Sequence, residues 1–168
     1  TDPDWSGTLI HLYSFSKSYR LTGHRVGAMV ASAEQLEEVE KYIDSTTICP
    51  NQIGQRAALW GMENLGQWLA GERAEILDRR AAIAEGAQHL QGWRLRGLGA
   101  YFAWVEHPFG IASDDLAQRL LAEQAILALP GTMFMPEGGG TNALRLAFAN
   151  IDRAGISRLF GRLAAFAA

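Results

Sequence analysis

A seven-residue recurrence of apolar side chains constrains the fold of this chain more than any other feature. Leu69, Ile76, Ile83 and Leu90 follow this spacing, and the charged residues among them lie mostly off their line. Such a spacing gathers apolar side chains on one stripe of a helix. Because the pattern is helical from Gln52 onward, we predict one long continuous helix. A helix of this length usually joins two packed units, and we expect two here.

The segments on either side of this helix predict an α/β fold. Leu9–Tyr13 and Ala28–Ala31 are short apolar runs typical of strands, and we expect the second to be buried on both faces. Ser32 is placed to cap a helix over residues 33–45. Beyond the long helix we expect four strands, at residues 93–95, 101–105, 126–129 and 144–149. Helices capped by Ser113 and Asp152 and a turn at residues 97–99 complete this second unit.

The composition limits the partners and the compartment. Of the 168 residues, 48% are hydrophobic and 20% charged, which is typical of a folded globular protein. A formal net charge of −3 favours neither nucleic acid nor an anionic membrane as partner. The single cysteine, Cys49, excludes an intrachain disulfide, and the histidines have no spacing typical of metal ligands. With neither a membrane-spanning run nor a signal peptide in the sequence, we expect a soluble cytoplasmic protein without a metal.

The stretch Ser14-Phe15-Ser16-Lys17, followed by Gly23-His24-Arg25-Val26-Gly27, carries the chemistry. A lysine attacks a carbonyl only as the neutral amine. Arg25 can bind a phosphate dianion through two charge-assisted hydrogen bonds, and the serine hydroxyls can donate beside it. The two glycines allow a positive φ or a close approach of the backbone. These residues predict a site for a ligand that carries both a phosphate and an aldehyde.

This pattern resembles the lysine signature of the fold-type-I aminotransferases of classes I and II, whose cofactor is pyridoxal 5'-phosphate. The resemblance implies that Lys17 binds the cofactor covalently and acts in catalysis. It also implies that Arg25, eight positions later, and Ser14, three positions earlier, contact the cofactor phosphate. Ser16 matches the same motif as a cofactor-binding residue. By the same resemblance, residues 1–75 are the C-terminal part of a large domain with an incomplete mixed sheet and the start of the connecting helix. Residues 76–168 are a small α+β C-terminal domain.

Two later stretches extend the resemblance to the substrate. Leu129–Phe134 and Leu144–Ala149 are similar to the family's final segment, in which a strand presents an arginine to the substrate carboxylate. This implies a substrate-binding role for Arg145, because an arginine in an apolar strand is costly unless an anion meets it. Tyr101 begins a stretch similar to the strand that borders the substrate, and we expect it to line the pocket. An ion pair within the protein and a core aromatic are the respective alternatives.

The resemblance also implies a partner subunit and a longer protein. Thr47–Gln55 is similar to the loop and helix start that face the second subunit, so we expect a homodimer; a simple helix entry is the alternative. In the family, the carboxylate that pairs with the cofactor's pyridine nitrogen precedes the lysine by far more than the 16 residues present here. We therefore expect this chain to be a fragment of a longer enzyme, and to bind the cofactor weakly or not at all by itself.

The activity implied for the longer enzyme is transfer of an amino group between an amino acid and a 2-oxo acid. The same motif serves carbon–sulfur lyases and related elimination enzymes, so the reaction type stays open at this level. A second alternative is an aminotransferase-like sensor domain of a transcription regulator. A third is an inert folded fragment without activity.

Overall fold

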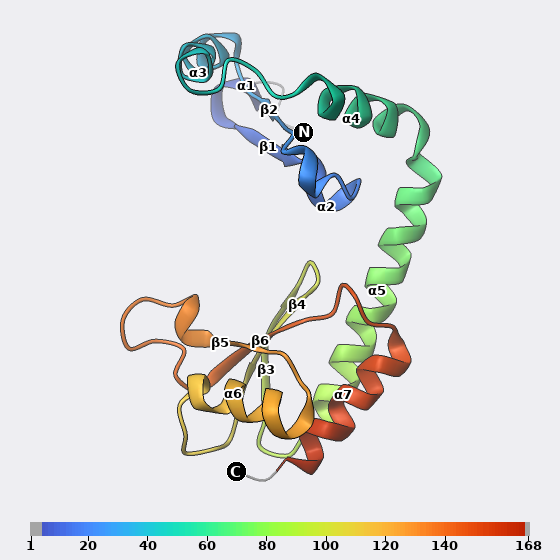
Figure 1. The fold of residues 1–168 in the computed structure, drawn as a ribbon, viewed down its shortest axis with the longest axis vertical. Coiled ribbons are helices and arrows are strands. Elements are labelled where there is room, and N and C mark those ends of the chain that lie inside the picture. The colour runs from blue at the N-terminus through green and yellow to red at the C-terminus, as the bar shows by residue number, and fades with distance from the viewer. Residues whose placement is uncertain (1–4, 167–168) are drawn as a thin grey trace. The chain divides into compact units, whose positions relative to one another are not determined.

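The computed structural model describes residues 5–166 and contains two compact units, Thr1–Gly71 and Glu72–Ala168, each with its own core (Figure 1). Helix α5 (Gly66–Gln88) begins in the first unit and ends in the second. Helices and strands are mixed in both units, as an α/β chain requires. The assignment of the units to a large and a small domain stays a prediction.

The first unit combines one antiparallel strand pair with helices. Strand β1 (His11–Ser14) pairs with β2 (Gly27–Val30), and Ser14 lies opposite Gly27. Its helical elements are α1 (Trp5–Thr8), α2 (Phe15–Ser18), η1 (Thr22–His24), α3 (Ala33–Thr46), α4 (Gln52–Asn64) and the first turns of α5. Ser32 caps α3 by accepting a hydrogen bond from the backbone of Gln35, as predicted.

Two predictions for this unit are wrong. Strand β2 is largely exposed rather than buried on both faces, because among the described residues its only strand neighbour is β1 and Val30 remains 46% exposed. The long helix is also not continuous: α4 ends at Asn64, and α5 starts afresh at Gly66. Glycine is about 1 kcal/mol less favourable than alanine inside a helix, so the Asn64-Leu65-Gly66 sequence is a weak point at which the helix breaks.

The second unit is a four-stranded antiparallel sheet with helices. The strands are β3 (Arg94–Gly99), β4 (Phe102–Glu106), β5 (Leu129–Pro130) and β6 (Ala143–Ala147), in the order β3-β4-β6-β5. Helices α6 (Ser113–Gln124) and α7 (Arg153–Ala165) and the short η2 (Gly131–Met133) complete it. Asp152 caps α7 through a hydrogen bond from the backbone of Gly155, as predicted.

Side chains that alternate along the central strands separate a buried face of this sheet from a more open one. Ala103 and Val105 of β4 and Leu144 and Leu146 of β6 are buried in one core with residues of α5, α6 and α7. Phe102 and Trp104 of β4 and Arg145 of β6 lie on the opposite face and stay partly exposed. The sheet therefore has one open face, and that face holds the predicted substrate arginine.

Local details of this unit differ from the sequence-based expectations. The turn between β3 and β4 falls at Ala100–Tyr101 rather than at residues 97–99, with Ala100 at a φ of 48°. Ser113 does not cap α6; it is the first helical residue, and its hydroxyl donates to the carbonyl of Gly140. A hydrogen bond to a distant segment has thus replaced the expected local one.

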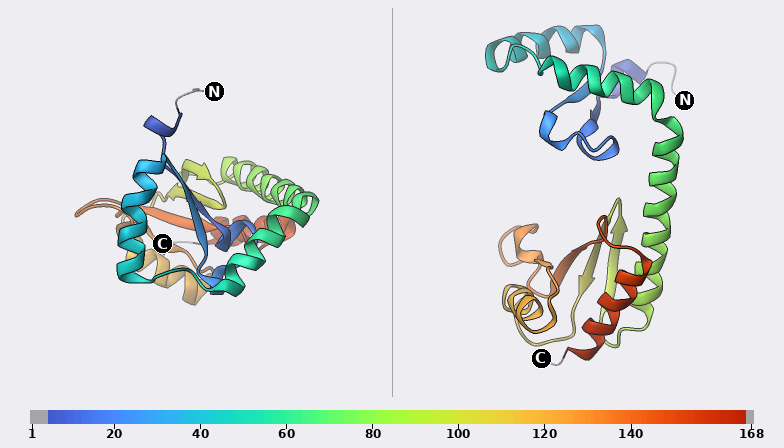
Figure 2. Two further views of the ribbon diagram at one scale, coloured as in Figure 1. Left: turned by 90° about the horizontal axis from the view of Figure 1, so that it is seen from above. Right: turned by 45° about the vertical axis from the view of Figure 1, so that its right-hand side comes forward.

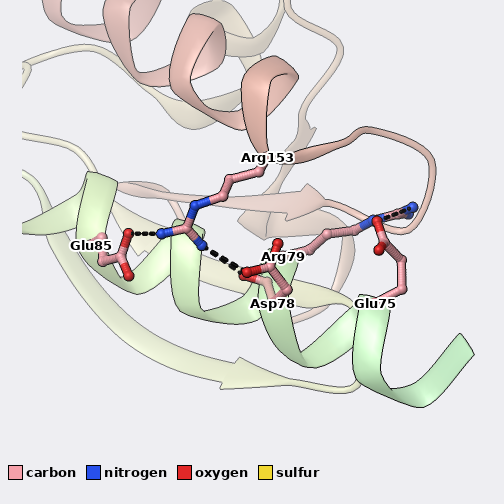
Figure 3. A network of polar contacts seen from close by, with 5 residues as sticks. All are labelled: Glu75, Asp78, Arg79, Glu85 and Arg153. Atoms are coloured by element: carbon pink, nitrogen blue, oxygen red, sulfur yellow. Dashed lines mark hydrogen bonds and ion pairs between the residues drawn. The ribbon is translucent and has the colours of Figure 1, made fainter. Parts of the chain in front are cut away.

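Helices α7 and α5 lie side by side within the second unit (Figure 2). Their contact is close, since a Cβ on Gly86 would overlap the Phe160 ring. Polar contacts tie the same helices together, as Figure 3 shows: Arg153 of α7 pairs with Asp78 at 3.0 Å and with Glu85. These carboxylates raise the pKa of Arg153, above all through its hydrogen bond to Glu85. Arg79, paired with Glu75, also donates to the carbonyl of Ala149.

The buried His107 gives this unit a predicted pH dependence of stability. Its ring packs against those of Trp93 and Phe109, and burial lowers the pKa of the imidazole. Just below a pH of about 6.5, which is the usual histidine pKa, this imidazole is protonated in the unfolded chain but still neutral in the folded chain. The free energy of unfolding should therefore fall as the pH drops below about 6.5, by about 1.4 kcal/mol for each unit by which folding lowers the pKa.

Urea unfolding at pH 7 and pH 5 measures this effect. His107→Phe should shrink the difference between the two pH values, whereas His89→Phe, at an exposed position, should leave it unchanged. An unchanged pH difference in His107→Phe would show that other groups cause it.

No helix among residues 5–166 is both long and apolar enough to span a membrane. Across the same residues, the structure contains no group of three histidine, cysteine or acidic side chains that could hold a metal ion.

Candidate functional site

The predicted cofactor lysine lies at the corner where β1 passes into α2. Ser14 ends the strand and caps the helix, with its hydroxyl accepting a hydrogen bond from the backbone of Ser16 at 3.3 Å. Phe15 is only 4% exposed and packs with Val26 and Ala58 in the core of the first unit. Lys17 stands two residues beyond Phe15, on the exposed side of the same helical turn. The buried phenylalanine therefore fixes the turn that presents the lysine.

Arg25 joins this corner through the backbone. The amide of Phe15 donates to the carbonyl of Val26, which places the segment before β2 beside the start of α2. Arg25 itself has a φ of 49°, and its guanidinium donates to the carbonyl of Thr22 at 2.9 Å. The side-chain amide of Asn51 donates to the carbonyl of His24 at 2.5 Å, so the start of α4 supports this loop. The arginine is held by its own loop and keeps further N–H donors for a ligand.

The backbone requires glycine at only one of the two glycine positions of the motif. A Cβ on Gly27 would lie 2.9 Å from the Tyr13 carbonyl oxygen, so the close approach of the two strands requires glycine there. A Cβ on Gly23 would meet nothing within 4 Å, and this residue has no positive φ. Gly23 therefore uses neither property that glycine allows, and the left-handed conformation in this loop is adopted by Arg25 instead.

The donors of this corner fit the phosphate and the aldehyde of pyridoxal phosphate. Two serine hydroxyls and one guanidinium can neutralise and solvate a phosphate dianion. Within residues 5–166, no carboxylate pairs with the Lys17 amine, so the amine is not engaged by an internal anion. These four side chains lie in the first unit, whereas Tyr101 and Arg145 belong to the second.

Arg145 lies on the open face of the second unit's sheet, in contact with two aromatic rings. Its Cζ atom is 4.3 Å from the centroid of the Phe102 ring and 4.1 Å from that of Phe134. Its buried Nε has no hydrogen-bond partner in the part of the chain that the structure describes. No carboxylate of that part pairs with it either, so the alternative of an internal ion pair has no support among those residues.

Tyr101 is half-buried beside the core of the second unit, with its ring 4.6 Å from that of Phe102. Its role as a substrate contact stays a prediction. Phe134 is a candidate that sequence reasoning missed. It follows η2 in a loop, and only its contact with Arg145 in space draws attention to it.

Comparison with known proteins identifies the family. The sequence model of "Aminotransferase class I and II" matches residues 1–163. The chain is 41% identical over 161 residues to the 2-aminoadipate transaminase of Thermus thermophilus, covering 92% of this chain and 40% of that protein. It is 30% identical over 152 residues to the aspartate aminotransferase of Thermotoga maritima, covering 86% of this chain and 36% of that protein.

Solved structures agree in fold. The α-aminoadipate aminotransferase of Thermus thermophilus, solved in complex with N-(5'-phosphopyridoxyl)-L-leucine, matches with a TM-score of 0.79 and 29% identity. That match covers 93% of this chain and 41% of the other. An Escherichia coli protein with a methionine aminotransferase function matches in fold, with a TM-score of 0.85 at 21% identity, covering 98% of this chain and 43% of its own. The chain thus spans about two-fifths of the length of the proteins that it matches.

Proposed function

Because this chain belongs to the aminotransferases of class I and II, we propose that it supplies the cofactor lysine and the substrate arginine of a pyridoxal-phosphate-dependent aminotransferase. The observation that carries this proposal is the corner between β1 and α2. There a buried phenylalanine and a serine cap present Lys17 beside a loop that holds Arg25. The reaction would transfer an amino group from an amino acid to a 2-oxo acid.

Each side chain of the corner has a role in this proposal. Arg25 and the Ser14 hydroxyl bind the cofactor phosphate, since a guanidinium supplies two parallel charge-assisted donors and a hydroxyl adds one more. Ser16 reinforces the same anion site from the first turn of α2. Lys17 attaches the cofactor through its amine. All of these groups belong to the first unit, so the phosphate and the lysine are positioned by one folded piece.

In the reaction, Lys17 moves a proton and Arg145 holds the substrate. Arg145 binds the α-carboxylate through its N–H edge, which fixes the direction of the α-C–H bond. The Lys17 amine, free of internal carboxylate partners within residues 5–166, removes the α-proton and later donates it as the amino group is transferred. Pyridoxal phosphate, when bound, delocalises the electron pair that the proton leaves behind.

The names of the matched proteins support transfer over elimination. The 2-aminoadipate transaminase and the aspartate aminotransferase cited above are both named for amino-group transfer. We accordingly propose amino acids and 2-oxo acids as substrates, and place the enzyme in amino acid metabolism in the cytoplasm.

We also propose a homodimer. Large apolar side chains are exposed on and beside α4 in the first unit: Ile48 at 73%, Ile53 at 73%, Leu59 at 53% and Trp60 at 58%. Apolar surface of this kind in one region marks a contact site. It includes the Thr47–Gln55 stretch, for which the sequence predicts contact with a second subunit.

Spectroscopy of the enzyme that contains this chain tests the proposed reaction. Adding an amino acid without a 2-oxo acid should convert the bound cofactor to its amine form, and adding a 2-oxo acid should restore the aldehyde form. Each conversion should stop after one equivalent, because neither half-reaction can repeat alone. Continuous release of ammonia with the amino acid alone would indicate elimination and contradict the proposal.

A further inference from the structure

We propose that Phe102 and Phe134 are positioning residues: they enclose the guanidinium of Arg145 from both faces and leave only its N–H edge for a substrate carboxylate. This inference rests on the carboxylate-binding role proposed for Arg145 and extends it to two residues with no polar groups. It begins from the two ring contacts, at 4.3 and 4.1 Å from Cζ to the ring centroids.

Both distances are well within the roughly 6 Å at which a cation is attracted to an aromatic face. A guanidinium is planar, and all of its N–H bonds lie in that plane. Rings on the two faces of this plane would keep water and other side chains from approaching above or below it. An anion is then bound in the plane, which is the arrangement that allows two parallel hydrogen bonds to a carboxylate.

The strand register brings Phe102 to this place. Arg145 of β6 lies opposite Trp104 of β4, and Phe102 lies opposite Ala147, one same-face position further along. A diagonal neighbour at this separation is within reach of an aromatic side chain. The small side chain of Ala147 leaves room beside Arg145, and the Phe102 ring contacts the guanidinium there.

Phe134 comes from a loop, and that loop is fastened at both ends. A Cβ on Gly131 would come within 2.5 Å of the Gly140 carbonyl oxygen, so the two ends of the loop touch. The hydroxyl of Thr132 donates to Asp114 at 2.8 Å, and the hydroxyl of Ser113 donates to the carbonyl of Gly140 at 3.0 Å. Both contacts fix the loop to the start of α6.

The Phe134 ring also contacts the ring of Trp104, and this contact orients it. The ring of Trp104 meets it edge-on at 6.1 Å between centroids and 80° between planes. Phe134 is nevertheless 41% exposed, so burial of the ring in a core does not explain its position. We therefore attribute the position of Phe134 to its contact with the Arg145 guanidinium.

Acidic side chains of the same unit also leave Arg145 available to bind an external anion. Glu106 of the same sheet pairs with Arg96 at 2.8 Å, and Asp114 at the start of α6 accepts a hydrogen bond from Thr132 of the loop. The Arg145 Nε is buried without a hydrogen-bond partner among the described residues. A carboxylate bound at the edge formed by the terminal Nη atoms would supply acceptors for their N–H groups.

Side-chain NMR of the 168-residue chain tests the proposal without any catalytic readout. The Nε–H signal of Arg145, assigned by its loss in Arg145→Lys, should be shifted upfield by the ring currents and should change its position on titration with propionate. Phe134→Leu and Phe102→Leu should each shift the signal downfield and weaken propionate binding by about 2- to 30-fold, the range expected from a lost cation–π contact. Phe134→Tyr, which keeps the ring, should restore both properties.

Two controls separate this effect from others. Met133→Leu changes an exposed neighbour of Phe134 and should leave the signal and the affinity unchanged. Sodium chloride at matched ionic strength should not reproduce the propionate shift. Unchanged propionate affinity in both leucine variants, or no propionate-dependent shift in the wild-type chain, would overturn the proposal. Failure of the proposed function has a different signature: Arg145 would bind propionate as described, while Lys17 formed no covalent link with the cofactor.

Discussion

Replacing Lys17 by alanine should lower the turnover of amino-group transfer by about 10²- to 10⁴-fold or more in the enzyme that contains this chain. Loss of a general acid–base group alone accounts for that range. The same variant also loses the covalent attachment of the cofactor. Because Lys17 is exposed and the anchor of its turn is Phe15, the fold should be unaffected. Steady-state rates with circular dichroism as a check of folding measure both effects.

Lys41 provides a matched control, because the chain has only these two lysines. It lies on α3 with 69% of its side chain exposed and pairs with Glu38. Lys41→Ala should therefore keep full activity. Comparable losses in the two variants would mean that a general change in charge or folding, rather than the chemistry of Lys17, explains the result.

Replacing Arg145 by alanine should raise the KM for amino acids and lower kcat/KM by orders of magnitude. Removing one partner of a hydrogen-bonded charge pair costs about 2–5 kcal/mol, and each 1.4 kcal/mol is a factor of ten. The absorbance of the bound cofactor should stay close to that of the wild type, since the proposed phosphate and lysine contacts lie in the other unit. Kinetics and absorbance spectra of the same preparation measure the two effects together.

Arg96→Ala is the appropriate control for this variant. Arg96 belongs to the same sheet but is engaged with Glu106 at 2.8 Å, so its loss should leave the KM nearly unchanged. An Arg145→Ala enzyme with a wild-type KM for the amino acid would refute the carboxylate-binding role.

The sequence predicted best where the determining interactions are local. Ser32 and Asp152 cap their helices through contacts within three residues, and such contacts can be read from a short stretch. The Ser14 cap of the turn that carries Lys17 is equally local, but it was not predicted, since the sequence indicated a loop there. The predictions for Ser113 and for the uninterrupted helix were wrong for different reasons. Ser113 found a partner 27 residues away, and the helix breaks beside Gly66.

The surroundings of Arg145 show where sequence reasoning ends. Its position in an apolar strand was enough to predict that it needs an anion. Its aromatic neighbours, by contrast, lie 43 residues before it on β4 and in the loop after η2, and only the strand register and the fastened loop bring them together. The stretch Leu129–Phe134 resembles the family's final segment, but Phe134 carries no polar group, so it was not itself predicted as a site residue.

Reduction of the cofactor-loaded enzyme with borohydride, followed by peptide mass mapping, tests the central claim most directly. Reduction makes the link between a lysine amine and the cofactor aldehyde permanent, so the labelled peptide identifies the attached residue. We expect one label per chain, on the peptide that contains Lys17, and none on the peptide of Lys41. A label on Lys41, or on any lysine other than Lys17, would contradict that claim.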